Sequence, residues 1–192
     1  MLKRVINKIV LVTSTYYVKV FFKIDSSTGT KFNKIPYYKK HLKANIKIGK
    51  NTVINSSNNG YHVNMFSKCK LYADKQNSEI IIGSNCRIHG TCIHAFKRIS
   101  IGDNCLIAAN TQIIDANGHQ NCFDDPEQRL IRKDEGREII IENNVWIGVG
   151  CIILGGSKIG SGTIVAAGSV VRGELDSNSV YSGNPIKKIK SF

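Results

Sequence analysis

The chain has 192 residues, of which 42% are apolar, and its 27 Lys and Arg outweigh 14 Asp and Glu to give a formal net charge of +13 at pH 7. A chain of this length buries enough surface to form a core without disulfides or metal ions, so a mainly disordered protein is excluded. The 17 glycines scattered among Ile, Val and Asn also exclude a coiled coil or a helical bundle.

The positive charge is concentrated in the first fifty residues, which hold 12 Lys or Arg and only one acidic residue, Asp25. Such a segment suits an anionic lipid, a nucleic acid or a phosphorylated ligand, and it also suits a solvated surface. The uncharged run from Ile9 to Val18 is too short to span a bilayer, and no signal-peptide cleavage site follows it. We therefore expect a cytoplasmic protein that binds no nucleic acid, with residues 1–45 forming a basic N-terminal cap.

Two expectations remain open for the start of this cap. In the first, cations and aromatic rings contact the cytoplasmic face of a membrane. The residues expected there are Lys3, Arg4, Lys8, Lys19 and Lys23, with Tyr16, Tyr17, Phe21 and Phe22 between them. In the second, residues 18–24 form a strand that caps an open end of the fold, because apolar and other side chains alternate there.

A six-residue repeat of aliphatic side chains runs through most of the chain. Its members are Ile48, Ile54, Ile82, Ile88, Ile101, Ile107, Ile113, Ile141, Ile147, Ile153, Ile159, Val165 and Val171. Neither the 3.6-residue period of a helix nor the two-residue period of a strand explains this spacing. A coil with three flat sides and three corners does explain it, if each hexapeptide supplies one side and one corner and its aliphatic residue points inward.

A second position of the repeat supports the same coil, because the residue four places after the aliphatic one is small. These residues are Thr52, Cys86, Cys92, Cys105, Thr111, Val145, Cys151, Ser157, Thr163 and Ser169. The cysteines among them are expected to pack inside the coil rather than to act as nucleophiles. All six cysteines of the chain lack paired spacing and CxxC motifs, which fits a reducing compartment.

Three stretches, residues 99–115, 142–171 and 183–190, resemble the hexapeptide-repeat acyltransferases, and among them the bacterial O-acetyltransferases of surface polysaccharides. The resemblance implies an all-β fold, a left-handed parallel β-helix, here over residues 46–180, followed by a basic tail over 181–192. It also implies a homotrimer, with each active site between neighbouring chains, that transfers the acetyl group of acetyl-CoA to a sugar hydroxyl. The acceptor could be free, nucleotide-linked or lipid-linked. The N-terminal region differs, since it lacks the helical cap of the maltose and galactoside acetyltransferases.

The repeat is interrupted from about residue 115 to 138 by a charged segment that must leave the coil as a loop. A sugar hydroxyl is a poor nucleophile until a base removes its proton, and imidazole suits this role near pH 7. The resemblance implies that His119, near the root of the loop, is the general base. Asp115 or Asn117 would orient this imidazole or contact the acceptor, and a turn-forming role is the alternative for both.

The resemblance places His89 at the acceptor cleft. The repeat would put His94 inside the coil, and it must slip by one residue within residues 94–100. A zinc hydratase is an alternative function, because γ-class carbonic anhydrases share the β-helix and bind zinc through three His, two of them five residues apart. Only His41 and His62 could supply the third ligand, so we expect no metal. A non-catalytic β-helix binding protein is the other alternative.

For the coenzyme, the resemblance singles out Trp146, the only tryptophan, which occupies an outward position. It is expected at the subunit interface, beside both the acceptor and the pantetheine arm. The residues implied for the rest of the coenzyme are Gly148, Ala166 and Ala167 along the arm, and Arg172, Lys187 and Lys190 at the phosphates. A purely structural Trp and a basic tail without a ligand are the alternatives.

Overall fold

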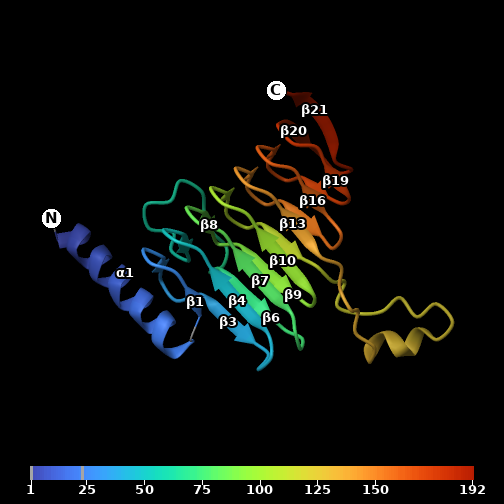
Figure 1. The fold of residues 1–192 in the computed structure, drawn as a ribbon, viewed down its shortest axis with the longest axis horizontal. Helices are drawn as coiled ribbons and strands as arrows, with labels where there is room; N and C mark the ends of the chain where they lie inside the picture. The colour runs from blue at the N-terminus through green and yellow to red at the C-terminus, as the bar shows by residue number, and fades with distance from the viewer. Residues whose placement is uncertain (1, 23) are drawn as a thin grey trace.

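The structure is a computed structural model that describes residues 2–22 and 24–192; Lys23 and the side chains of residues 2–4 lie outside the described part. Apart from the last strand, its strands wind through three parallel sheets in strict rotation, one strand per sheet in each turn (Figure 1). This arrangement confirms the predicted parallel β-helix, a prism with three flat sides.

The three sides are called sheets A, B and C. Sheet A contains β1 (Asp25–Ser26), β4 (Asn45–Ile48), β7 (Glu79–Ile82), β10 (Arg98–Ile101), β13 (Ile139–Ile141), β16 (Lys158–Ile159) and β19 (Glu174–Leu175). Sheet B contains β2 (Lys31–Asn33), β5 (Val53–Asn55), β8 (Arg87–His89), β11 (Leu106–Ile107), β14 (Trp146–Ile147), β17 (Ile164–Val165), β20 (Ser179–Ser182) and β21 (Lys187–Ser191). Sheet C contains β3 (Tyr37–Lys40), β6 (Lys70–Ala73), β9 (Cys92–Ala95), β12 (Gln112–Ile114), β15 (Ile152–Leu154) and β18 (Val170–Val171).

The interior of the prism is filled as the repeat predicts. All thirteen aliphatic residues of the repeat are buried, and nine of the ten small residues four places later are also buried. The exception is Cys92, which is only half-buried, while the preceding residue, Thr91, is completely buried in its place. The prediction that Cys92 is an interior residue is therefore wrong.

The cause is a one-residue slip in the repeat. This slip lies earlier in the chain than the six-residue spacing predicted. Ile88 and Ile93 are successive inward residues only five positions apart, because the corner at Gly90 is one residue short. The next turn recovers its register with a longer passage from Ile93 to Ile101. As a result, His94 faces outward from sheet C instead of inward, and the slip precedes it rather than following it.

Asparagine supports the corners between sheets A and B. Asn51, Asn85, Asn104 and Asn144 adopt the left-handed conformation, with φ between 57° and 60°. The side-chain amide of Asn85 donates to Asn104, and that of Asn104 donates to Asn144, both at 3.2 Å. The resulting ladder holds successive turns in register.

The N-terminal cap is helical, which corrects both the predicted strand over residues 18–24 and the inferred lack of a helical cap. Helix α1 (Leu2–Phe21) lies at the N-terminal end of the coil (Figure 1) and packs against β2. The side chain of Val18 is completely buried. The backbone N–H of Phe32 donates to the Thr15 hydroxyl at 3.0 Å. The coil itself begins at β1, earlier than the expected boundary at residue 46. In the described part of the chain, no helix has the length and apolarity needed to cross a membrane.

Two segments outside the regular coil shape the surface. The chain between β12 and β13 leaves the prism as a long loop that contains a short 3-10 helix, η1 (Pro126–Leu130), and projects away from it (Figure 1). At the C-terminal end, β21 turns back and pairs antiparallel with β20. The expected basic tail is thus largely a strand of sheet B.

Candidate functional site

A groove of about 500 Å³ lies on the outer face of sheet B. Strands β8, β11, β14 and β17 and the corners that follow them form its walls. Five of the residues expected at the site line it together: His89, Trp146, Gly148, Ala166 and Ala167. The structure therefore brings the expected arm-binding residues and the expected acceptor-cleft histidine to one surface.

A row of outward side chains forms the floor of this groove. Leu106, Trp146 and Ile164 are paired in register on β11, β14 and β17, so their side chains stack along the axis of the coil. Trp146 is 51% exposed and Leu106 is 43% exposed, although both are large and apolar. Exposed apolar rows of this kind mark a surface that a ligand or another chain covers.

The same row leads to the C-terminal cations. Ile164 pairs with Val180 on β20, and Val180 pairs with Lys190 on β21. Three steps between neighbouring strands separate Trp146 from Lys190, which is roughly 14 Å at the usual inter-strand spacing. Lys187, which pairs with Ser182, lies on the same strand as Lys190. The outer face of sheet B therefore continues from the groove, across β20, to two exposed ammonium groups.

Gly148 has a structural reason to be glycine. A Cβ atom at this position would lie 2.5 Å from the backbone nitrogen of Ala167 in the next turn. The Gly148 N–H also donates to the carbonyl of Val165 at 2.8 Å. Stacking of the corners thus requires the missing side chain, whether or not a ligand approaches.

His89 stands at the end of the groove farthest from the cations. Its Nδ1 lies 3.1 Å from the side-chain amide nitrogen of Asn55, and its ring stacks on Tyr61 with 4.3 Å between centroids and 14° between planes. Burial, helped by the positive charge of Arg87, lowers the pKa of His89 to about 4. The imidazole is therefore neutral near pH 7 and can donate or accept a hydrogen bond.

Tyr61 and His62, which the sequence did not single out for the groove, also line it. They belong to a second excursion from the coil, residues 56–69. The side chain of Asn110 anchors this segment, because it accepts from the N–H of Phe66 and donates to the carbonyl of Asn64, both at 2.9 Å. The available signal was the gap in the repeat between Ile54 and Ile82.

The expected base lies on a different edge of the prism. His119 is exposed in the long loop, which connects sheet C to sheet A. Asn117 beside it is exposed, and its backbone N–H donates to Asp134 at 2.9 Å. Arg172 also lies between sheets C and A, after β18, and so does not share the face of Lys187 and Lys190. Within one chain, His119 is not a wall of the groove.

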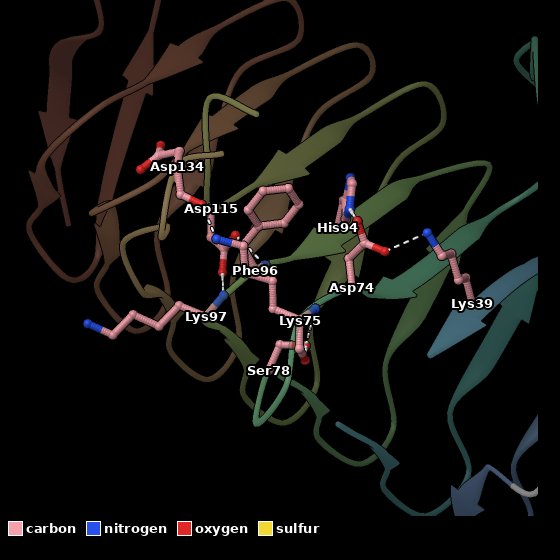
Figure 2. A network of polar contacts seen from close by, with 9 residues as sticks. All are labelled: Lys39, Asp74, Lys75, Ser78, His94, Phe96, Lys97, Asp115 and Asp134. Carbon is pink, nitrogen blue, oxygen red and sulfur yellow. Dashed lines mark hydrogen bonds and ion pairs between the residues drawn. The ribbon is translucent and has the colours of Figure 1, made fainter. Parts of the chain in front are cut away.

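Asp115, at the root of the loop, is almost completely buried, with 1% of its surface exposed. Its carboxylate accepts hydrogen bonds from the backbone N–H groups of Phe96 and Lys97 at 2.7 and 2.8 Å (Figure 2). It also accepts one from the N–H of Arg98 at 2.9 Å. These contacts hold the long passage between β9 and β10. They favour the structural alternative for Asp115 over direct contact with an acceptor.

A smaller pocket of about 220 Å³ lies beside the loop root. It is lined by His94, Phe96, Ile114, Ala116, Asn117 and Gly118, of which His94 and Ile114 are neighbours on β9 and β12. Because Gly118 directly precedes His119, this pocket is next to the expected base. The sequence did not identify it, because the uninterrupted six-residue spacing placed His94 inside the coil, whereas the slip turns it outward.

The geometry does not favour the zinc alternative. His89 lies on β8 of sheet B and His94 on β9 of sheet C, so the two rings project from different sides of the prism. In the described residues, no group of three His, Cys, Asp or Glu side chains gathers as metal ligands would. The five-residue spacing therefore does not bring the pair to one point.

Comparisons with known proteins agree with this architecture. Residues 138–173 match the family described as bacterial transferase hexapeptide (six repeats). The crystal structure of AntD, an N-acyltransferase from Bacillus cereus in complex with dTDP and 3-hydroxybutyryl-CoA, has the same fold, with a TM-score of 0.68 and 24% identity. The match covers 93% of this chain and 89% of that one.

Two proteins of Escherichia coli K12 are also similar. WbbJ, provisionally named a lipopolysaccharide biosynthesis O-acetyl transferase, is 34% identical over 52% of this chain and 54% of its own. Galactoside O-acetyltransferase is 36% identical over 49% of this chain and 44% of its own. The chain thus spans about half the length of these curated relatives. The coil of hexapeptides and these matches make the chain similar to the hexapeptide-repeat acetyltransferases.

Proposed function

We propose that this protein transfers the acetyl group of acetyl-CoA to a hydroxyl group of a sugar, with His119 as the general base. The observation that carries the proposal is the continuous outer face of sheet B, which joins Trp146 and the groove to Lys187 and Lys190. An apolar groove on a sheet face that continues to two cations suits a long flexible arm that ends in phosphates. The O-acetyltransferase relatives support a hydroxyl acceptor, and WbbJ supports a sugar of a surface polysaccharide or its precursor.

In this reaction the imidazole of His119 takes the proton of the acceptor hydroxyl while its oxygen attacks the thioester carbonyl. The tetrahedral intermediate then collapses, the carbon–sulfur bond breaks, and the imidazolium returns the proton to the departing thiolate. The products are the acetylated sugar and free coenzyme A. His119 suits this role because its loop position leaves the ring open to two incoming substrates.

A homotrimer with three sites between neighbouring chains belongs to the same proposal. His119 lies on the edge between sheets C and A, whereas the groove lies on sheet B, so one chain does not unite them. In a closed threefold assembly, the loop of one chain can lie over sheet B of the next. The exposed Leu106 and Trp146 would then be covered.

The proposal also includes peripheral contact between α1 and the cytoplasmic face of a membrane, where a lipid-linked acceptor would be held. Val5, Ile9, Val12 and Tyr16 recur at three- and four-residue spacing on the exposed face of α1. Helices of this kind lie in the lipid interface, and each cation near an anionic surface contributes about 1 kcal/mol. Sedimentation with phosphatidylglycerol vesicles, compared with phosphatidylcholine vesicles, tests this part, and equal sedimentation of a Val12→Asp variant would refute it.

The test of the reaction is thiol release from acetyl-CoA with a panel of methyl glycosides as acceptors, followed by mass analysis of the sugars. His119→Ala should lower turnover by about 10² or more without a change in coenzyme affinity. Gln120→Ala, an exposed neighbour in the loop, is the matched control. Turnover of His119→Ala within a few-fold of wild type would remove His119 as the base, and no acetylated sugar with any acceptor would remove the substrate class.

A further inference from the structure

The outer face of sheet C carries a line of polar groups beside the loop root. Lys39 on β3 forms an ion pair with Asp74, just after β6, with 2.6 Å between Nζ and Oδ1. The other carboxylate oxygen of Asp74 lies 3.5 Å from Nε2 of His94 on β9 (Figure 2). Adjacent turns of the coil thus place a cation, an anion and an imidazole in sequence, and the imidazole ends the line at the small pocket.

Aromatic neighbours hold the His94 ring in place. Tyr72 lies on one side with 5.7 Å between ring centroids, and Phe96 lies on the other with 5.2 Å, both edge-to-face. The side chain of His94 remains 26% exposed, so a molecule in the pocket can reach it. A ring that is packed on two sides and open on a third is oriented for contact with a ligand.

The carboxylate of Asp74 also favours one tautomer of the His94 ring, because it lies nearest to Nε2. Its hydrogen-bonded partner Lys39 lowers the pKa of Asp74, so this group is ionised at neutral pH. A negative charge on this side favours the proton on Nε2. The other nitrogen, Nδ1, is then an acceptor of hydrogen bonds.

Nε2 of His94 is buried without a hydrogen bond of normal length, since 3.5 Å from Asp74 is a long contact. Such an arrangement costs stability and is uncommon for a group with only a structural role. A ligand that bonds to Nδ1 would polarise the ring and strengthen the attraction between Nε2–H and the carboxylate.

We propose that the pocket between His94 and the loop root is the acceptor subsite, and that Nδ1 of His94 accepts a hydrogen bond from a sugar hydroxyl next to the one that is acetylated. This inference rests on the proposed acetyl transfer to a sugar. The pocket's 220 Å³ suit one monosaccharide ring, and Phe96 and Ile114 add apolar lining for its C–H groups. Gly118, which also lines the pocket, places the bound ring next to His119. The acceptor class is a pyranoside with two neighbouring free hydroxyl groups.

The experiment compares wild type with His94→Phe and His94→Gln, using the methyl glycoside that wild type acetylates and its analogue deoxygenated at the neighbouring position. Loss of a hydrogen bond to a substrate hydroxyl leaves a buried polar group unpaired, so His94→Phe should raise the acceptor KM about tenfold or more. The KM for acetyl-CoA should not change. His94→Gln, which keeps an acceptor oxygen, should recover part of the loss, and His41→Phe, at an exposed histidine, is the matched control.

The deoxy analogue separates recognition from a structural role. Wild type should lose about tenfold in kcat/KM with the analogue, whereas His94→Phe should show little further loss, because the bond is already gone. Equal losses in both proteins, or an unchanged acceptor KM in His94→Phe, would overturn the inference. Melting temperatures of the variants show whether the fold is intact. Failure of wild type to acetylate any glycoside would instead refute the proposed function.

Discussion

Asp115 is a buried carboxylate whose three hydrogen bonds all go to backbone N–H groups of the passage after β9. That passage carries the extra residues with which the coil recovers its register after the short corner at Gly90. A single side chain therefore repairs an irregularity in the repeat. Asp115 supports both the base of the loop and the lining of the small pocket, because Phe96, which lines that pocket, donates one of the three hydrogen bonds.

Asp115→Ala should accordingly destabilise the protein more than most single substitutions. Three backbone donors would lose their acceptor in a buried position, and we expect a decrease of about 3 kcal/mol in the free energy of unfolding. Urea denaturation followed by circular dichroism measures this. Asp124→Ala, at an exposed position of the same loop, should change stability by less than about 0.5 kcal/mol; equal effects of the two would contradict the role of Asp115.

The cysteines should differ in reactivity according to their place in the coil. Cys69, Cys105 and Cys151 are completely buried, and burial raises the pKa of Cys69 to about 11. Cys122 lies in the loop and is only partly buried. Iodoacetamide added to the native protein should modify Cys122 first, as peptide mass analysis would show. Modification of Cys105 or Cys151 before unfolding would contradict their interior position.

His89 should make stability depend on pH between neutrality and mild acid. Its pKa is about 4 in the folded protein, against an ordinary value of 6.5. Between these two pH values the imidazole is protonated in the unfolded chain and neutral in the folded protein. Stability must then fall as pH falls through this window, by at most roughly 2 kcal/mol between pH 7.5 and 5. Urea unfolding at both pH values measures the slope. His89→Gln should flatten it, and an unchanged slope would assign the effect elsewhere.

At the scale of elements, the regular part of the repeat could be predicted from the sequence, whereas the positions at which it breaks could not. In a three-sided coil, side chains spaced six residues apart all point inward. The positions of Ile and Val were therefore sufficient to predict the order of the strands in the sheets and the residues of the core. The slip near Gly90 could not be located by spacing, because a short corner followed by a long passage leaves the distant residues nearly in register. His94, and with it the second pocket, was therefore missed.

The prediction of a strand over residues 18–24 failed because the local pattern there fits more than one structure. Alternation over residues 18–24 spans two turns of helix at most, and the same residues also fit a helix when Leu11, Ser14 and Val18 are counted together. Packing against β2 decides between the two, and only the folded coil supplies that surface. By contrast, the resemblance to the acyltransferases named Trp146, Gly148, Ala166 and Ala167 in advance, and the structure places all four around one groove.

The cap should detach when its buried face is charged. Val18→Asp would place a carboxylate where the side chain is completely buried, so α1 should separate while the coil remains folded. Limited trypsin digestion should then cleave near Lys8 and Lys19 and leave a resistant coil. Val12→Asp, at a position that is 60% exposed, should leave α1 protected. Equal protection in both variants would contradict the packing of α1 through Val18.

At the scale of the whole molecule, the separation of His119 from the groove leads to a test of shared sites. His119→Ala removes the base, and Ala167→Trp blocks the groove with a bulky side chain at an exposed position. Each variant alone should be inactive. After denaturation and refolding together in equal amounts, a trimer with shared sites should recover about a quarter of wild-type activity, because random assembly pairs the two intact halves that often. No recovery would show that each chain holds a complete site.

At both ends of sheet B, an element that is not a further turn of the coil covers the outermost strand of the coil. At one end the Thr15 hydroxyl of α1 accepts a hydrogen bond from the backbone N–H of Phe32, and at the other end β21 pairs antiparallel with β20. A stack of identical turns has no natural length, since each open rim is a template on which a further chain could add. The outermost strands of the other two sheets are mostly only two residues long, which offers little to such growth. The two closures therefore make this solenoid a finite particle rather than the first unit of a fibre.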